Sequence, residues 1–426
     1  MAPGLNGCCM VTAERRDVPE LLRQADLSWL RRRRFGRAAR ARAEEFASAP
    51  MAATMQNPYR RIAQERTRMS ELPLVSVVIP MRNESTHIGA CIDAVLAQDY
   101  PTDRIEIVVI DGDSDDDSAR VLRGYGGRIR VLHNPSRIVP TAMNIGITAA
   151  CGEIIARVDA HTVVAPEYIW VGVETLQRTG ADNVGGPMNA VGGGRWGTAI
   201  ALAMGSRFGI GAYFHFAAAD REVDTVYMGM YPRRVFERIG LFDEELVRNQ
   251  DDELNYRLRK SGGRIFLTTR MQSRYQNRQS VTALVRQFFE YGWWKIRVLQ
   301  KHPAQMSVRH FVPPSLVLSL VVSAVLTPWS AAAGWLFCAI AGAYVVAVTA
   351  CAASVAPRHG CNLVAPVAAA FAAIHLSWGT GFVLGALRFA PRWLANEPQP
   401  PRLRAQQVAG TPSIEWKHDS PPATTP

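Results

Sequence analysis

Two long stretches without a charged side chain limit what this chain can fold into. No Asp, Glu, Lys or Arg occurs from residue 311 to residue 356, and none from residue 360 to residue 387. Apolar stretches of about 18 residues or more are typical of membrane-spanning helices. As a helix, the 46 residues of the first stretch would be about 70 Å long, more than twice the roughly 30 Å thickness of a bilayer core. The sequence therefore excludes a purely soluble protein.

The apolar stretches divide into segments of membrane-spanning length. The first stretch is long enough for two crossings with a turn near Pro328, and the second predicts a third crossing, in which Gly381 and Gly385 would let two helices approach closely. Within a membrane region at 311–390, we expect segments at 311–329, 331–355 and 361–387. Three crossings would place Arg388 on the far side of the membrane, against the tendency of Lys and Arg to stay on the cytoplasmic side. A re-entrant or divided third segment therefore stays open as an alternative.

The excess of positive charge lies in an N-terminal arm. The formal net charge is +11, and residues 1–70 supply +7 of it, with 14 Arg against 7 acidic residues. A nucleic-acid-binding core would carry its basic residues inside the folded domain. We therefore expect no nucleic-acid partner, a basic arm at 1–70 that is disordered or partly helical, and a disordered Pro-rich tail at 391–426.

The cysteines argue against a disulfide-bonded domain. Seven are scattered along the chain, and no Cys-x-x-Cys pattern occurs. An odd number without metal-binding spacing does not form a disulfide framework. The first 30 residues also lack the apolar central run of a secretory signal peptide. We expect the globular part of the chain to face a reducing compartment.

Between residues 71 and 280, short apolar runs alternate with helical patterns. Strands are predicted at 74–80, 105–110, 129–132 and 153–158, and helices near 118–123, 141–150, 233–239 and 251–260. Continuous apolar runs are typical of strands buried on both faces. Strands that alternate with helices predict an α/β domain with a mainly parallel sheet and a ligand site at the carboxyl ends of the strands.

Two further segments have a distinct composition. Residues 180–230 are rich in glycine and predict an irregular, mobile wall of a cleft. Residues 281–310 combine aromatic with basic side chains, a combination typical of a helix at a membrane interface.

Asp159 and His161 directly follow the strand predicted at 153–158. Residues i and i+2 of an extended chain project to the same side, so this carboxylate and imidazole can share one divalent cation. Carboxylates suit Mg²⁺ or Mn²⁺, and an imidazole favours Mn²⁺. Such a cation would neutralise the charge of a leaving nucleoside diphosphate. The alternative is a loop in which Asp159 caps the next helix.

Two other acidic groups occur at the ends of predicted elements. Asp111 and Asp113 follow a buried strand, and as hydrogen-bond acceptors they could bind the imide N–H of uracil and a ribose hydroxyl. The alternative is a solvated turn before a helix. Asp251 and Asp252 begin a helix, where the helix dipole favours acidic residues. The functional interpretation is a general base that accepts a proton from an acceptor hydroxyl.

Together, and in this order, the motifs resemble those of the family 2 glycosyltransferases. The resemblance covers about residues 73–300 and rests on residues 80–84, 111–114, 142–146, 159–161, 240–244 and 250–257. It implies an α/β fold of the GT-A type, with a Rossmann-like, mainly parallel sheet, followed here by C-terminal transmembrane helices. The Asp-x-His pair and the apolar C-terminal segments look most like bacterial exopolysaccharide glycosyltransferases of the succinoglycan-biosynthesis type.

The resemblance also implies roles for individual residues. The donor nucleotide-sugar would be bound by Pro80, Arg82, Glu84, Asp111, Asp113 and Asp159. A divalent cation, Mg²⁺ or Mn²⁺, would be held by Asp159 and His161. Counted back from Arg257, the acidic motif of the family makes Asp251 the expected base and Asp252 the second choice. Trp293 and Trp294 would either stack on an acceptor sugar or anchor the chain at the membrane interface.

The implied activity is inverting transfer of one sugar in exopolysaccharide or cell-surface glycan synthesis. The donor would be a UDP-hexose, with UDP-glucose as the default, and the acceptor a saccharide on a polyprenyl-type lipid. The protein would cross the inner membrane several times with its catalytic domain in the cytoplasm. Gln287 is not followed by the Arg-Trp of the processive synthases, which indicates single transfer.

Two other classes of function were weighed. A nucleotidyltransferase would be expected to carry a Gly-rich phosphate loop after its first strand, and residues 80–85 contain no glycine. A non-catalytic membrane sensor of sugar nucleotides remains the alternative, although it would not need both the base and the metal pair.

Overall fold

A computed structural model of the chain describes residues 72–210 and 212–394. The expectations for an N-terminal arm and for a disordered tail fall outside these residues, apart from residues 391–394, which continue the last helix.

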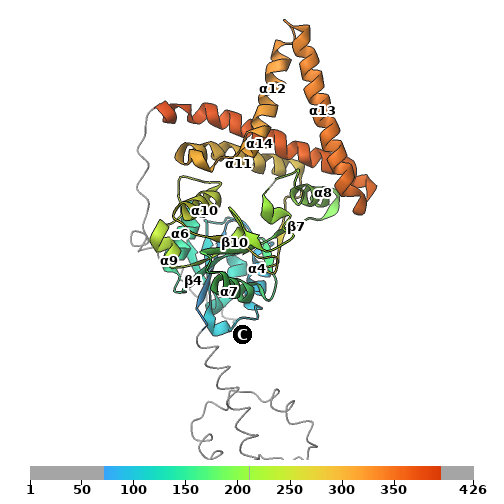
Figure 1. Cartoon of the computed structure of the whole chain (residues 1–426). Helices are drawn as coiled ribbons and strands as arrows, with labels where there is room; N and C mark the ends of the chain where they lie inside the picture. The colour runs from blue at the N-terminus through green and yellow to red at the C-terminus, as the bar shows by residue number, and fades with distance from the viewer. Residues whose placement is uncertain (1–71, 211, 395–426) are drawn as a thin grey trace, which may run out of the picture. The chain divides into compact units, whose positions relative to one another are not determined.

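An eight-stranded sheet forms the centre of the first part of the described chain (Figure 1). Its order is β3-β2-β1-β4-β9-β6-β10-β8. The strands are β1 (Val75–Met81), β2 (Ile105–Asp111), β3 (Arg130–His133), β4 (Ile154–Arg157), β6 (Asn183–Gly186), β8 (Arg221–Glu222), β9 (Tyr227–Pro232) and β10 (Ile265–Leu267). The pairs β1–β2, β1–β4, β2–β3 and β6–β10 are parallel, whereas β9 and β8 pair in the antiparallel sense. The sheet is therefore mainly parallel, as the sequence predicts.

A smaller sheet and seven helices complete this α/β part. The sheet has the order β5-β11-β7, with β5 (Thr162–Val164), β11 (Ser273–Gln276) and β7 (Met188–Val191). The helices are α4 (Ile88–Leu96), α5 (Ser118–Arg123), α6 (Val139–Ala149), α7 (Tyr168–Thr179), α8 (Gly194–Met204), α9 (Arg234–Ile239) and α10 (Gln250–Lys260). The four predicted strands and four predicted helices are present with bounds that differ by one or two residues.

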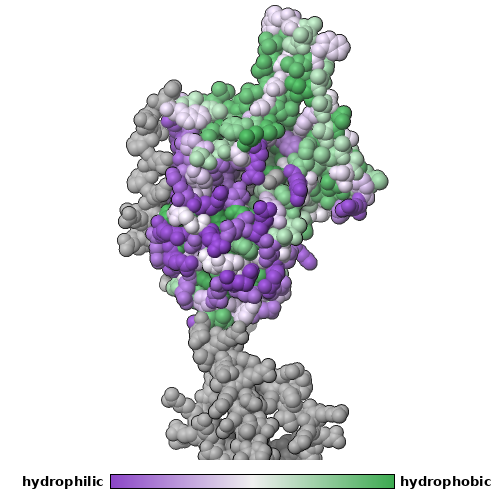
Figure 2. All heavy atoms as spheres, viewed as in Figure 1, coloured by the Kyte–Doolittle hydropathy of each residue, from purple (hydrophilic) through white to green (hydrophobic). Residues whose placement is uncertain are grey.

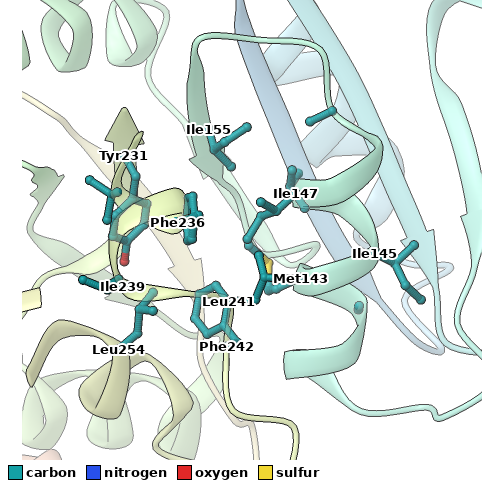
Figure 3. Close-up of a cluster of buried hydrophobic side chains, with 14 of the residues drawn as sticks. Met143, Ile145, Ile147, Ile155, Tyr231, Phe236, Ile239, Leu241, Phe242 and Leu254 are labelled. Carbon is teal, nitrogen blue, oxygen red and sulfur yellow. The ribbon is translucent and has the colours of Figure 1, made fainter. Parts of the chain in front are cut away.

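One apolar cluster packs α6 and α9 against the sheet (Figure 3). Met143 and Ile147 of α6 and Phe236 of α9 belong to it and are buried. Helix α6 can lie this close because residue 146 is glycine: a Cβ atom there would overlap the side chains of Val78 and Ile110. The cluster fixes the carboxyl ends of β1, β2 and β4 relative to one another.

The prediction of an irregular segment at 180–230 is wrong, because this segment contains β6, β7, α8, β8 and part of β9. Two of its glycines allow close packing of the backbone. A Cβ atom at Gly185 would press against Val226, and one at Gly186 would overlap the carbonyl oxygen of Met271. Composition alone does not separate this use of glycine from flexibility.

Four long helices follow: α11 (Val281–Lys301), α12 (Val312–Leu326), α13 (Ala331–Val355) and α14 (Val364–Leu394). Three segments among the described residues are long and apolar enough to cross a membrane, namely Val308–Leu326, Ala331–Arg358 and Cys361–Trp393. Figure 2 shows that hydrophobic surface is concentrated over these segments, whereas hydrophilic surface covers the α/β part. The turn between α12 and α13 lies at residues 327–330.

Candidate active site

The loops after β1 and β2 are joined by hydrogen bonds. The strands pair in register from Val75 opposite Ile105 to Met81 opposite Asp111. Beyond their ends, the backbone N–H of Asn83 donates to Ser114 Oγ at 2.9 Å, and the N–H of Asp115 donates to Asn83 Oδ1 at 3.0 Å. The first two predicted motifs therefore form one continuous edge.

Asp111 lies in this edge and is 8% exposed. Its Oδ1 accepts from the Ser114 backbone N–H at 3.2 Å and from Ser114 Oγ at 2.6 Å. Asp113 is half-buried and pairs with Arg137, whose Nε donates to Asp113 Oδ2 at 2.9 Å. The hydrogen bond and charge of Arg137 hold the pKa of Asp113 below its usual value. Asp113 therefore stays a hydrogen-bond acceptor at neutral pH, as the predicted contact to the ribose requires.

The other predicted residues of the nucleotide pocket differ in exposure. Pro80 is buried in β1, and Arg82 is exposed just beyond it. Glu84 joins this edge to the third motif, because its Oε1 lies 3.0 Å from His161 Nδ1. The other carboxylate oxygen of Glu84 lies 3.3 Å from His87 Nδ1. Glu84 therefore bridges two loops.

Arg157 joins the third motif to the fourth. It ends β4, and its Nε donates to Asp159 Oδ1 at 2.8 Å while its Nη1 donates to Asp251 Oδ1. Arg157 is only 8% exposed. A buried charge of this kind needs partners, and here the partners are the two carboxylates expected to act on the donor diphosphate and the acceptor hydroxyl.

Asp251 and Asp252 begin α10 with different surroundings. Burial, opposed by Arg157 and reinforced by Asp159 and Asp252, raises the pKa of Asp251. For Asp252 burial is outweighed by Lys295 of α11, which donates to Asp252 Oδ2 and lowers the pKa. Asp251 is therefore the stronger proton acceptor of the two.

Arg257 fixes the start of α10 in place. Its Nε donates to Glu253 Oε1 at 2.7 Å, and its two terminal nitrogens donate to the carbonyl oxygens of Ile239 at 2.6 Å and Leu241 at 2.8 Å. His302 Nε2 lies 2.8 Å from the same Glu253 oxygen. This buried network connects the Gly-Leu-Phe-Asp-Glu segment with the helix that carries Asp251.

The Gly-Leu-Phe-Asp-Glu segment at 240–244 is also tied to α6. Asn144 Nδ2 donates to the Phe242 carbonyl at 3.0 Å, and the Phe242 N–H donates back to Asn144 Oδ1 at 2.9 Å. The motif residues Asn144 and Gly146 therefore position the site and do not belong to its chemical surface.

Among residues 72–210 and 212–394, no group of three or more His, Cys, Asp and Glu side chains lies close enough to hold a metal ion. The predicted set has two protein ligands, Asp159 and His161. The carboxylate of Glu84 at His161 Nδ1 fits that set, because a metal-binding histidine usually pairs its second ring nitrogen with a carboxylate. The donor atoms therefore suit a cation whose remaining ligands come from a diphosphate and water.

A polar cleft of about 290 Å³ lies beside the second acid of α10. It is lined by Asp224, Asp252, Tyr256, Arg259, Gln305, Ser307, Arg309 and His310. Trp293 and Trp294 lie elsewhere, with ring centroids 5.7 and 5.9 Å from that of Phe389 in α14. Their expected contact with an acceptor sugar stays a prediction, and their observed contact is helix packing.

Sequence reasoning missed Arg157 and Lys295. The signal for Arg157 was a charged residue at the end of an otherwise apolar run, Ile154-Ile155-Ala156. The signal for Lys295 was weaker, since a lysine beside Trp293 and Trp294 also suits a membrane interface. Neither partner could be read from the sequence, because Asp251 and Asp252 lie 94 and 43 residues away.

Comparisons with known proteins identify the family of the chain. The model of the family "Glycosyl transferase family 2" matches residues 76–240. The chain is 31% identical over 323 residues to the succinoglycan biosynthesis protein ExoA of Rhizobium meliloti (strain 1021). The aligned region covers 74% of this chain and 96% of that protein. The chain belongs to the family 2 glycosyltransferases. This confirms the resemblance, the enzyme class and the α/β fold that were predicted from the sequence.

Two further matches are more distant. A dolichyl N-acetyl-alpha-D-glucosaminyl phosphate 3-beta-D-2,3-diacetamido-2,3-dideoxy-beta-D-glucuronosyltransferase of Methanococcus voltae is 27% identical over 238 residues, or 53% of this chain and 74% of that one. Among solved structures, a mannosyltransferase from Pyrobaculum calidifontis in complex with GDP-Man and Mn²⁺ is 18% identical. The aligned region covers 72% of this chain and 88% of the mannosyltransferase chain, with a TM-score of 0.45.

Proposed function

We propose that this glycosyltransferase moves one sugar from a nucleotide-sugar to a saccharide on a lipid carrier, with inversion at the anomeric carbon. The observation that carries the proposal is the guanidinium of Arg157 between Asp159 and Asp251. This one cationic group binds both Asp159, the carboxylate expected at the donor diphosphate, and Asp251, the carboxylate expected at the acceptor hydroxyl.

The donor would lie along the joined ends of β1, β2 and β4. Asp111 and Asp113 would accept hydrogen bonds from the base and the ribose, and the diphosphate would reach Asp159 and His161. UDP-glucose is the default donor through the resemblance to exopolysaccharide enzymes. A bound Mg²⁺ or Mn²⁺ at Asp159 and His161 would supply positive charge to the departing diphosphate.

Asp251 would act as the general base. The acceptor hydroxyl gives its proton to the Asp251 carboxylate while its oxygen forms a bond to the anomeric carbon. The bond from that carbon to the donor diphosphate breaks, and the electron pair leaves with the nucleoside diphosphate. The raised pKa of Asp251 suits this proton transfer better than that of Asp252, which Lys295 neutralises.

The cleft beside Asp252 supports a lipid-linked acceptor. Arg309 and His310 line this cleft and directly precede α12, which can enter a membrane. A phosphate between lipid and saccharide would meet the Arg309 guanidinium, and attachment to the same bilayer would raise the effective concentration of both partners. The scattered cysteines and the resemblance support a site on the cytoplasmic face of the inner membrane.

The test is sugar transfer by membranes that contain the full chain. Radiolabelled UDP-, GDP- and dTDP-sugars would be supplied with Mg²⁺, with Mn²⁺ or with a chelator, and label would be measured in the lipid extract. We expect cation-dependent label from one donor, absent in Asp251→Asn and retained in Asp117→Asn, an exposed acid of the α5 N-terminus. Saturable donor binding without transfer to any native lipid extract would favour the sensor alternative.

A further inference from the structure

Helix α14 contacts the α/β part and the residues next to it along its whole length. Near its start, Arg195 of α8 donates to the Asn362 carbonyl at 3.5 Å, and Phe371 packs with Ile200 and Ala203 of α8. In its middle, His375 Nε2 lies 2.7 Å from the Phe208 carbonyl oxygen. The burial of the three apolar segments reflects these contacts. In the most apolar 18 residues of the segment Cys361–Trp393, 44% is buried, compared with 11% in each of the other two segments.

The C-terminal end of α14 is held by Glu245 of the α/β part and by Gln300 of α11. Arg392 Nη1 lies 2.5 Å from Glu245 Oε1, and Gln300 Nε2 donates to the Phe389 carbonyl at 2.8 Å. From Asn362 to Arg392 the chain rises about 45 Å as a helix, which exceeds the roughly 30 Å of a bilayer core. A helix that crossed the membrane would therefore need Arg195 and Glu245 on opposite faces of the bilayer, although one folded domain carries both.

Helix α11 gives a second argument, because it runs beside α14 at very short distance (Figure 1). A Cβ atom at Gly381 would overlap the carbonyl oxygen of Phe289, and one at Gly292 would overlap that of Trp378. The two helices must therefore share one environment. Charged residues of α11 are Arg286, Glu290, Lys295, Arg297 and Lys301. That many charges are too costly for the hydrocarbon core but suit its surface.

The face of α14 that points away from the domain is apolar. The exposed side chains on this face include Ala365, Ala369, Leu384 and Leu387. The exposed Arg388 lies in the last turns of the helix. An uncharged face next to two helices that can enter the membrane matches a lipid surface, and an arginine near its end can reach the headgroups.

We infer that α11 and α14 lie flat on the bilayer surface and that only the α12–α13 hairpin enters the membrane. The chain then returns to the side of the catalytic domain after α13, and Arg388 and Arg392 stay on that side. This removes the conflict with the positive-inside tendency that three crossings create. The inference rests on the membrane attachment proposed above. The lipid bilayer would cover the exposed face of α14.

The depth of two positions on α14 tests the orientation of the helix. Ala369 and Leu387 are both exposed and 18 residues apart, which is five full turns, so they share one face about 27 Å apart along the axis. Ala369→Cys and Leu387→Cys would each be spin-labelled in a full chain whose seven native cysteines are replaced by serine. Paramagnetic relaxation by oxygen and by a soluble nickel complex in lipid vesicles then gives both depths. We expect equal, shallow depths, and a difference approaching 27 Å would overturn the inference.

The side of the C-terminus provides an independent test. Cys151 is exposed on the α/β part and serves as the reference when the other six cysteines are replaced. Ser413→Cys would report the C-terminal residues, and Ser330→Cys the turn of the hairpin. With a membrane-impermeant thiol reagent on sealed vesicles, Ser413→Cys should react from the same side as Cys151. A reaction of Ser413→Cys from the opposite side would overturn the inference and leave the proposed function intact. Recovery of the chain in the soluble fraction would contradict both.

Discussion

Arg257 is predicted to hold α10, and with it Asp251, in the position that the reaction needs. The guanidinium makes three hydrogen bonds of 2.6 to 2.8 Å, to Glu253 and to the carbonyl oxygens of Ile239 and Leu241. Glu253 is 2% exposed. Arg257→Met would leave this carboxylate buried with only His302 beside it, and the loss of one partner of a buried pair costs about 3–5 kcal/mol.

Thermal unfolding of the purified full chain in lipid nanodiscs would measure this cost. At about 2 °C for each kcal/mol in a chain of this size, we expect Arg257→Met to lower the Tm by about 6–10 °C. The matched control is Arg259→Met, because Arg259 lies two residues further on the same helix and is exposed. We also expect a loss of sugar transfer below the new Tm. If both variants melted at the same temperature as the unchanged chain, the network around Arg257 would not hold α10.

Three other perturbations separate parts of the structure. Contacts with His302 and Arg257 lower the pKa of Glu253 from 4.5 to about 2 despite its burial. The ionised Glu253 therefore stabilises the fold at pH values above its unfolded pKa, and this stabilisation is lost as the pH falls. The Tm should fall as the pH drops from about 5 toward 2, and it should fall less steeply in Glu253→Gln. Gly381→Leu should lower the Tm by several degrees because its side chain meets the backbone of α11, whereas Gly342→Leu, at a position with open space in α13, should not. Asp159→Asn should abolish the Mn²⁺ dependence of UDP binding in a calorimetric titration; an unchanged dependence would remove Asp159 from the cation site.

Local patterns explain why much of the fold could be predicted. Asp111 ends the apolar strand at 105–111, and Asp159 closely follows the strand at 154–157. Parallel strands bring their carboxyl ends to one edge of the sheet. Asp111 and Asp159 could therefore be placed near each other before any side-chain geometry was available.

Contacts between distant segments were beyond that reasoning. Arg157 and Lys295 find their partners on α10 through the fold and not through spacing. Composition likewise identified the apolar segment at 361–387, but not its close packing on α11. The glycines at 185 and 186 were taken for flexibility because the backbone that they contact comes from residues 226 and 271.

The most direct measurement compares donor binding with turnover in Asp251→Asn and Asp252→Asn, in the same membranes and with the donor that supports transfer. The proposed role of Asp251 predicts unchanged donor affinity and a turnover lowered about 10²-fold or more in Asp251→Asn, with a smaller loss in Asp252→Asn. Equal loss of donor binding and turnover in Asp251→Asn, or full turnover in that variant, would contradict Asp251 as the base.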